Sequence, residues 1–536
     1  MKRTILYISF LFTSSVIFAQ TITSLDPAFK SKLLQSSASN FIAQNLSGNY
    51  IAIDANGNNQ IEVSEAREVI TLNISNSSLS SVNGIENFIN LSLLNCASNK
   101  VSALNCSAFS DLVSLNCSNN LLTTINLASL SNLKQLDCSS NQLSTLNLNG
   151  LSTLQNVNCS NNNLTTLTLV NVDGLEILDC SYNKIATLDT SDIYNINLLL
   201  CNDNALTTLS LDGLPSLQEL NCSNNQLVAA DFGNLLSLLN LNCDYNKLTS
   251  ISFSNVPQLS VFSCANNLLT DLNLSSFPNL IELNCSDNLI TMLDVNSNTD
   301  LITLNCNTNK LASVFFNNLS NLNYLYCNNN LLTSIDVLDL SSLLVLSCNQ
   351  NQLTSLNVGI SSTIQTIFCS NNLLTNLDLR DVSQLTSLFC ANNSLSSILI
   401  KNGSNQDNLV LSGNPNLNYI CADESEIEFV NEMLAYYNIT NCTVTSSCSL
   451  ASATETTSTI SDIQLYPNPA KDFINFNLHP FLPIQSIKIY NSMGQLMKTI
   501  HDSSDTRIEI SELSTGFYLI NFHYEDRVIA AKFIKK

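Results

Sequence analysis

Cysteine is the residue type whose spacing first suggests chemistry in this chain. Fifteen of its 19 cysteines recur every 21 residues, at Cys96, Cys117, Cys138, Cys159, Cys180, Cys201, Cys222, Cys243, Cys264, Cys285, Cys306, Cys327, Cys348, Cys369 and Cys390. Thiols at regular spacing could form a disulfide ladder, a metal–thiolate array, or a row of small buried side chains. So strict a period also means that one structural unit is stacked on copies of itself.

The residues around these cysteines favour burial over thiol chemistry. The sequence has no Cys-x-x-Cys pair and no histidine near the repeated cysteines, so a zinc site is not expected. Parallel, inward-pointing Cβ atoms in neighbouring coils would give poor disulfide geometry. Cys106 stands where the next copies have Leu127 and Leu148, which favours a thiol acting as a small apolar side chain. Exported proteins usually pair their cysteines, so burial must protect this row from oxidants.

A second candidate for chemistry is an oxygen-rich loop, residues 54–65, with the sequence DANGNNQIEVSE. The loop resembles an EF-hand calcium loop. The resemblance implies oxygen ligands from Asp54, Asn56, Asn58, the Gln60 carbonyl, Glu62 and bidentate Glu65, with Ile61 packing inward. Asn59 replaces the usual glycine, and Asn58 replaces an aspartate, which lowers the charge available to the ion. We expect either a calcium site that stabilises an N-terminal cap or a polar loop that leads into the first coil.

The elements that position these residues follow from one repeat, residues 112–132 (LVSLNCSNNLLTTINLASLSN). The shared frame is L-x-x-L-x-C-x-x-N-x-L-x-x-L-x-L, and an asparagine follows each of the fifteen cysteines by three residues. Alternation in L-x-C predicts a short strand with Leu and Cys on one side. The asparagine predicts a turn, because its amide both donates to and accepts from unpaired backbone groups. In stacked coils these amides would form a ladder.

This frame resembles the leucine-rich repeat family, in a short bacterial form with Cys in the third Leu position. The resemblance implies an α/β-type repeat solenoid, a right-handed coil with a parallel sheet on its concave face. It covers about 320 residues within a repeat region of 70–414, with degenerate copies at residues 74–79 and 411–414. At about 4.8 Å per coil, fifteen or sixteen coils would extend roughly 70–75 Å.

Other segments surround the repeats. Residues 1–19 combine Lys2, Arg3, an apolar run and Ala19, which predicts a secretory signal peptide. Residues 20–69 predict an N-terminal cap, helical around 29–34, and residues 415–448 a C-terminal cap with a helix around 426–437. We expect one disulfide among Cys421, Cys442 and Cys448, then a flexible linker over 449–460. No later apolar run reaches the length of a membrane span.

Residues 461–536 predict a small all-β sandwich, because strand-like alternation is punctuated by Gly and Pro turns. The motifs LYPNPA, IKIY, GQ, LSTGFY and KFIKK resemble, in order and spacing, the C-terminal sorting domain of the type IX secretion system of Bacteroidetes. The resemblance implies contact with that machinery, export to the outer surface of a Gram-negative bacterium, and anchoring or release. The alternative is a generic immunoglobulin-like module. The signal residues that the resemblance to the sorting domain implies are Tyr466, Pro467, Asn468, Pro469, Gly494, Gly516, Tyr518 and Lys535.

Charge and composition exclude several function classes. The net charge is −22; because residues 1–19 contribute +2 and residues 461–536 are neutral, the body between them carries −24. Such a body repels nucleic acid and anionic lipid and favours cationic partners. The three histidines, His479, His501 and His523, all lie in the C-terminal module, so the repeats lack a base for a catalytic triad. We therefore expect that this protein is not an enzyme.

The strand residues opposite the core lie three before, one before and one after each cysteine, here called the minus-three, minus-one and plus-one rows. The minus-one row is mostly Asn or Asp up to Asn305 and then becomes aromatic. Exposed aromatic residues on a sheet mark partner sites, so we predict protein binding at Tyr324, Tyr326, Val345, Phe368 and Phe389. Alternatively, a cap or self-contact covers these residues, or the Asn and Asp rows bind glycan hydroxyls or calcium.

These observations predict a secreted or cell-surface binding protein, adhesin-like, that recognises proteins through its concave face. Two alternatives remain: a glycan-binding or substrate-capture protein, and a structural component of a surface coat. The fold alone does not choose among them.

Overall fold

The computed structural model describes residues 20–448 and 465–536, except for 317–318, 339, 360–362, 477–485, 492–495, 502–506 and 524–527. The chain divides into two compact units between Cys448 and Ser449. The predicted signal peptide, the predicted linker and Gly494 lie outside the described residues.

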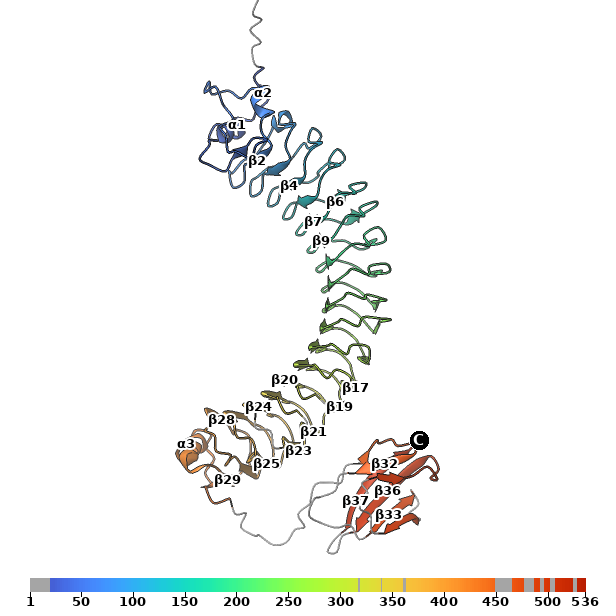
Figure 1. Cartoon of the computed structure of the whole chain (residues 1–536). Coiled ribbons are helices and arrows are strands. Elements are labelled where there is room, and N and C mark those ends of the chain that lie inside the picture. The colour runs from blue at the N-terminus through green and yellow to red at the C-terminus, as the bar shows by residue number, and fades with distance from the viewer. Residues whose placement is uncertain are drawn as a thin grey trace, which may run out of the picture. The chain divides into compact units, whose positions relative to one another are not determined.

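The first unit is a solenoid that curves into an arc, and its concave side carries one long parallel sheet (Figure 1). From β3 to β28 each strand pairs with the strand 21 residues later, so that Leu94 lies beside Leu115 and Leu115 beside Leu136. The parallel strands are β2 (Thr71–Asn73), β3 (Leu93–Asn95), β4 (Ser114–Asn116), β5 (Gln135–Asp137), β7 (Asn156–Asn158), β9 (Ile177–Asp179), β10 (Leu198–Leu200), β11 (Glu219–Asn221), β13 (Asn240–Asn242), β15 (Val261–Ser263), β16 (Glu282–Asn284), β18 (Thr303–Asn305), β20 (Tyr324–Tyr326), β22 (Val345–Ser347), β24 (Thr366–Phe368), β26 (Ser387–Phe389) and β28 (Asn408–Val410).

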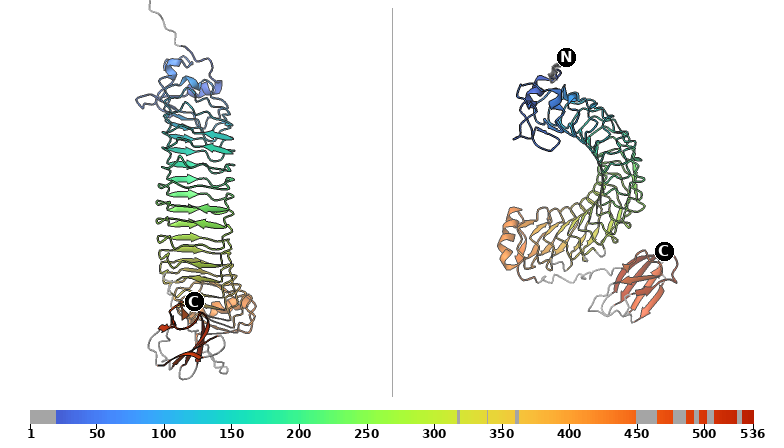
Figure 2. Two further views of the ribbon diagram at one scale, coloured as in Figure 1. Left: turned by 90° about the vertical axis from the view of Figure 1, so that its right-hand side faces the viewer. Right: turned by 45° about the horizontal axis from the view of Figure 1, so that its top comes forward.

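Shorter parallel sheets lie on the outer side of the arc, where the coils stack like rungs (Figure 2). Except for the last two, each strand begins seven residues after a cysteine, at a position the sequence analysis did not assign to a strand. These strands are β6 (Thr145–Asn147), β8 (Thr166–Thr168), β12 (Ala229–Asp231), β14 (Ser250–Ser252), β17 (Met292–Asp294), β19 (Ser313–Phe315), β21 (Ser334–Asp336), β23 (Ser355–Asn357), β25 (Asn376–Asp378), β27 (Ser397–Leu399), β29 (Tyr419–Cys421) and β30 (Thr443–Thr445).

The core between the two faces contains the leucines and the repeated thiols. All fifteen cysteines are free and at most 1% exposed, as the burial interpretation predicts. Burial raises the pKa of thiols such as Cys180 and Cys285 to about 12. Because the thiolate is the reactive form, these side chains are chemically inert apolar residues.

The predicted asparagine ladder connects each coil to the one before it. Asn225 shows the pattern: its Nδ2 donates to the carbonyl oxygens of Cys201 at 3.0 Å and Cys222 at 3.1 Å. Its Oδ1 accepts from the N–H of Leu206 at 2.9 Å. The residue before each asparagine has a positive φ of 51–59°, from Ser98 to Asn392. One buried amide therefore satisfies backbone groups on two coils, which explains why the asparagine never changes.

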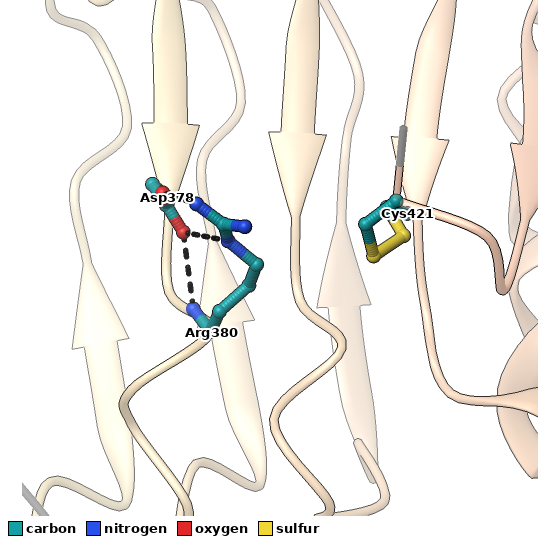
Figure 3. Close-up of polar contacts among 4 residues, drawn as sticks. Asp378, Arg380 and Cys421 are labelled. Atoms are coloured by element: carbon teal, nitrogen blue, oxygen red, sulfur yellow. Dashed lines mark hydrogen bonds and ion pairs between the residues drawn. A yellow bond between two sulfur atoms is a disulfide. The ribbon is translucent and has the colours of Figure 1, made fainter. Parts of the chain in front are cut away.

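Both ends of the solenoid are covered. The N-terminal cap contains α1 (Pro27–Leu33), β1 (Ala43–Gln44) and α2 (Val63–Ala66), and the short helix η1 (Ile85–Asn87) follows β2. The C-terminal cap contains η2 (Glu424–Glu426) and α3 (Ile427–Tyr436), close to the predicted helix. Of the three cysteines there, Cys421 and Cys448 form the disulfide (Figure 3), and Cys442 is free. The exposed Asp378–Arg380 ion pair nearby, at 2.6 Å, contributes little stability.

The second unit confirms the predicted all-β module. One antiparallel sheet contains β31 (Leu465–Tyr466), β32 (Phe473–Phe476) and β35 (Arg507–Glu509), and the other contains β33 (Ser486–Asn491), β34 (Leu496–His501), β36 (Gly516–His523) and β37 (Val528–Lys535). Ile474, Phe476, Ile489, Ile520 and Phe522 are among the residues of its separate core.

Candidate binding surface

The five residues predicted to bind a partner lie on four neighbouring strands of the concave sheet. Tyr324 is paired with Val345 along the minus-three row, and Phe368 with Phe389 along the minus-one row. Tyr326 precedes Phe368 on the same row, with Ser347 between them. All five side chains are half-exposed. We call this group the aromatic strip, and the structure places it on a single face, as the sequence predicts.

Within the strip the two phenylalanines form a stacked pair. Their ring centroids are 4.6 Å apart, and the ring planes differ by 18°. Ser347 is only 5% exposed, so no polar side chain projects between Tyr326 and Phe368. Stacked, half-exposed rings on a rigid sheet offer a large apolar contact area with little conformational entropy to lose on binding.

In the early coils, the minus-one residue has a structural task that an aromatic residue could not perform. The Oδ1 of Asp137 accepts from the N–H of Ser139 at 3.1 Å and from its hydroxyl at 2.6 Å. Asn158 caps Ser160 in the same way, at 3.0 and 2.7 Å. In each pair the first bond satisfies a backbone N–H at the end of a strand, and the second holds the serine hydroxyl.

In the late coils, this cap comes from the plus-one residue of the preceding coil instead. The donor–acceptor pairs are Asn328 N–H to Asn307 Oδ1 at 2.6 Å, Asn349 N–H to Asn328 Oδ1 at 2.7 Å, Ser370 N–H to Asn349 Oδ1 at 2.7 Å, and Ala391 N–H to Ser370 Oγ at 3.1 Å. We call this arrangement the relay cap. A continuous run of these caps begins at the coil where Tyr326 replaces the asparagine of the minus-one row. An isolated earlier instance is the N–H of Ala265, which donates to Asp244 Oδ1 at 2.6 Å in a coil whose minus-one residue is Ser263.

The relay cap frees the minus-one position for Tyr326, Phe368 and Phe389 without leaving their backbone neighbours unsatisfied. Sequence analysis missed it and assigned the plus-one row to the exposed face. The structure turns that row partly inward: Ser160, for example, is 6% exposed. The signal was present as a change from Ser to Asn along the row at Asn307, Asn328 and Asn349.

The oxygen-rich loop of the N-terminal cap folds back on itself. Both carboxylate oxygens of Asp54 accept from backbone N–H groups, from Asn58 at 3.1 Å and Asn59 at 2.9 Å. Glu65 accepts from the N–H of Ala55 at 2.9 Å and of Glu62 at 3.0 Å, which joins the two ends of the loop. Asn59 has φ of 60°, the conformation for which the EF-hand pattern uses glycine.

Two carboxylates lie close together in this loop. Glu62 is 3% exposed and accepts from the side-chain amides of Asn56 at 3.1 Å and Asn58 at 2.9 Å. Its hydrogen bond with Glu65 lowers the pKa of Glu62, while burial raises the pKa of Glu65. A like-charged pair of this kind tends to retain a proton in the absence of a cation.

The predicted ligands are all of the type that a hard divalent cation prefers. Asp54, Glu62 and Glu65 supply carboxylates, Asn56 and Asn58 amide oxygens, and Gln60 a carbonyl, all of which are oxygen donors. Ile61 is fully buried and its carbonyl accepts from the N–H of Ile22 at 2.9 Å, so the loop is fixed from behind. Within the described residues, no cluster of three His, Cys, Asp or Glu side chains is arranged to bind a metal.

In the second unit, most of the predicted signal residues gather around the last strand. The side chain of Asn468 donates to Lys532 O at 3.1 Å and accepts from the N–H of Ile534 at 2.8 Å. Tyr518 stacks on Phe533 at 5.4 Å and donates from its hydroxyl to Ser514 O at 2.8 Å. The side chain of Asn468 therefore connects the Tyr466–Pro469 segment to the terminal strand β37.

Comparison with known proteins found a family match in the second unit and similar solved structures. Residues 464–536 match the secretion system C-terminal sorting domain family. The functional domain of InlJ from Listeria monocytogenes, which includes a cysteine ladder, is 21% identical and covers 89% of this chain and 93% of its own, with a TM-score of 0.52. YopM from Yersinia enterocolitica is 21% identical and covers 67% of this chain and 89% of its own, with a TM-score of 0.43. None of the curated proteins matches the sequence.

The chain therefore combines a leucine-rich-repeat solenoid with a type IX secretion sorting domain. The sorting domain directs the protein to the cell surface or the extracellular space. Among the described residues, no helix has the length and apolar character required to cross a membrane.

Proposed function

We propose that this protein is an adhesin-like binding protein of the bacterial surface that recognises a protein ligand with its aromatic strip. The relay cap is the observation that carries the proposal. In the coils between residues 307 and 391, the N–H group at the end of each strand is capped by a side chain of the preceding coil. The minus-one row, which no longer supplies this cap, carries half-exposed aromatic rings on the concave sheet. Aromatic side chains on a rigid, half-exposed surface supply most of the binding energy in protein interfaces.

The test is capture of surface-displayed proteins and glycans by the purified protein and by its Phe368→Ala/Phe389→Ala variant. We expect the wild type to capture a protein. The variant should bind that protein at least about 100-fold more weakly, since two stacked hot-spot residues are removed. The control is Tyr182→Asn/Tyr245→Asn, which removes two aromatic side chains that are 54% and 61% exposed outside the strip.

The outcomes separate the three function classes. Equal capture by the wild type, the Phe variant and the Tyr control would show that the aromatic strip is not part of the binding site. Capture of polysaccharide that survives the Phe substitutions would favour the glycan-binding alternative, and self-association without an outside ligand would favour a coat component.

We also infer that the loop at residues 54–65 binds calcium and that the ion stabilises the N-terminal cap. The number of oxygen donors, the left-handed Asn59 and the adjacent carboxylates of Glu62 and Glu65 support this proposal. The ion would draw together segments that otherwise depend on a few hydrogen bonds, and its bidentate ligand Glu65 lies in α2, directly before the first coil.

A further inference from the structure

A groove of about 490 Å³ lies on the concave sheet over β4, β5, β7, β9 and β10, which are different strands from those of the aromatic strip. Its floor is the minus-one row of the early coils, which runs Asn116, Asp137, Asn158, Asp179 and Leu200. The minus-three row forms its side and ends in the apolar residues Ile177 and Leu198.

The floor presents donors and anions in alternation. Each of the four polar residues uses its Oδ1 to accept from a serine two residues later, as in Asn116 with Ser118 at 3.0 Å and Asp179 with Ser181 at 3.0 Å. The second polar atom has no hydrogen-bond partner in the part of the chain that the structure describes. The groove therefore offers an NH₂ group, a carboxylate oxygen, an NH₂ group and a carboxylate oxygen, one per coil.

The spacing of these groups selects the shape of a ligand. Adjacent parallel strands lie about 4.8 Å apart, so the free oxygens of Asp137 and Asp179 are roughly 9.6 Å apart. A polyproline II helix advances about 9.3 Å in three residues and has no internal backbone hydrogen bonds. Basic side chains at positions i and i+3 of such a peptide would meet both carboxylates, and its free carbonyls would accept from Asn116 and Asn158.

The charge and the apolar residues of the groove indicate the chemistry of its ligand. Across the three rows between Leu93 and Ala391 there are five acidic residues and no Lys or Arg: Asp137, Asp179, Glu219, Asp244 and Glu282. At the far end Ile177 is 37% exposed, and Leu200 replaces the polar residue of the row. This end would accept an apolar side chain one or two residues beyond the second basic one.

We propose that this groove binds a basic peptide segment in the polyproline II conformation, with Lys or Arg at positions i and i+3 followed by an apolar residue. The site is independent of the aromatic strip, so either proposal can fail while the other holds.

The experiment titrates fluorescein-labelled Lys-Pro-Pro-Lys-Pro-Leu into the purified full-length protein at low salt. We expect Asp137→Asn/Asp179→Asn to weaken binding about tenfold, since two charge pairs are lost while the Oδ1 atoms that cap the serines are kept. The matched control is Asp231→Asn/Asp294→Asn on the outer strands β12 and β17, where the same charges are removed and Oδ1 also caps a backbone N–H. This control should bind within about twofold of the wild type.

Two further comparisons test spacing and the apolar end. The isomer Lys-Lys-Pro-Pro-Pro-Leu, with adjacent lysines, should bind at least about fivefold more weakly. Leu200→Asn, which continues the polar row, should weaken only the peptide that ends in Leu and leave a Ser-ended peptide unchanged. Equal binding of both isomers, an equal loss in the outer-face control, no binding at all, or tighter binding of a chitosan oligomer would each overturn the proposal.

Discussion

The early and late halves of the concave sheet have the same backbone and the same core but present opposite chemistry. In the early half the minus-one row is Asn116, Asp137, Asn158 and Asp179, which cap their own coils and face a polar groove. In the late half the row becomes aromatic, and its caps are supplied by the coil before. The ends differ too: an oxygen-rich loop covers the early coils, and a helix with a disulfide covers the late ones.

This contrast shows which positions of the repeat are free to change. The asparagine ladder, the cysteine and the leucines are the same in both halves because every coil must satisfy the same buried backbone groups. In the late half, the minus-one residue changes where a side chain of the preceding coil takes over its hydrogen bond. Binding chemistry can therefore differ along one solenoid while the fold stays uniform.

The largest expected effect tests whether the two halves share one interior. Asn141 and Asn351 are each 8% exposed and make the same contacts, including an accepted N–H from Leu122 at 2.9 Å and from Leu332 at 3.1 Å. Either Asn→Ala substitution leaves several buried backbone groups unpaired. We expect each to cost about 3–5 kcal/mol of unfolding free energy.

Urea unfolding with hydrogen-exchange detection measures this cost locally, as a repeat array requires. The control Asn240→Ala, on the exposed minus-three row, should stay within about 0.5 kcal/mol of the wild type. A loss at Asn141 without a similar loss at Asn351 would show that the interiors are not equivalent.

The second prediction concerns the cap of the early half. Saturating calcium should stabilise residues 20–69 by about 2.7 kcal/mol at 100 times its dissociation constant, measured by thermal unfolding with and without chelator. Glu65→Gln should abolish this shift. Glu68→Gln removes the same charge just outside the loop and should preserve it, because Glu68 is exposed.

The same site should respond to pH in a defined direction. Because burial raises the pKa of Glu65, its proton is retained above the usual range for a glutamate, and calcium must displace it. Calcium affinity should therefore rise between pH 5 and pH 7. Affinity that is constant over this range would exclude Glu65 as a ligand.

The third prediction concerns the cap of the late half. Glu426 is 2% exposed, and its Oε1 accepts from the N–H of Gln406 at 2.6 Å, whereas its Oε2 is buried without a partner among the described residues. Burial raises the pKa of Glu426 above its usual value near 4.5. The folded cap thus binds a proton that the unfolded chain has lost, and stability falls as pH rises above 4.5.

Glu426→Gln keeps the acceptor oxygen and removes the charge. We expect it to stabilise the C-terminal cap by about 1–2 kcal/mol at pH 7.5, because a buried charged carboxylate is replaced by a neutral amide. The gain should shrink towards pH 4.5, where Glu426 itself is protonated. Thermal unfolding at both values checks this, and a gain that grows on acidification would contradict the sign of the pKa shift.

Sequence patterns were sufficient for the features that recur. The period placed the strands of the repeated coils on the concave sheet, the buried thiols and the asparagine ladder, because the same pattern recurs in every coil. It did not place β1, which pairs antiparallel with β2 at the edge of that sheet. The predicted partner site at Tyr324, Tyr326, Phe368 and Phe389 was visible as a change from mostly polar to aromatic residues along the exposed rows of the sheet. What the sequence did not show depends on orientation: which polar atom of Asp137 faces the groove, and which side chain caps Ser370.

The smallest effect bears most directly on the comparison, because it asks whether the two capping modes can be exchanged. In the early half, Asn158→Phe should cost about 1 kcal/mol by leaving the N–H of Ser160 unpaired. Adding Ser139→Asn supplies the relay cap from the preceding coil and should recover most of that loss. In the late half, Asn349→Ala should cost about as much and be rescued by Phe368→Asn, since that residue could then cap Ser370 from its own coil.

The first double-mutant cycle replaces a cap from the same coil by a relay cap, and the second replaces a relay cap by a cap from the same coil. In each cycle the unfolding free energy should show a favourable coupling of about 1 kcal/mol. Coupling in both cycles would establish that an aromatic residue in the minus-one row requires a polar residue one coil earlier. Additive losses would mean that the hydrogen bonds from Asn307, Asn328 and Asn349 accompany the aromatic strip without making room for it. The early and late halves would then differ in surface alone, and the strongest support for a dedicated binding surface in the late coils would be lost.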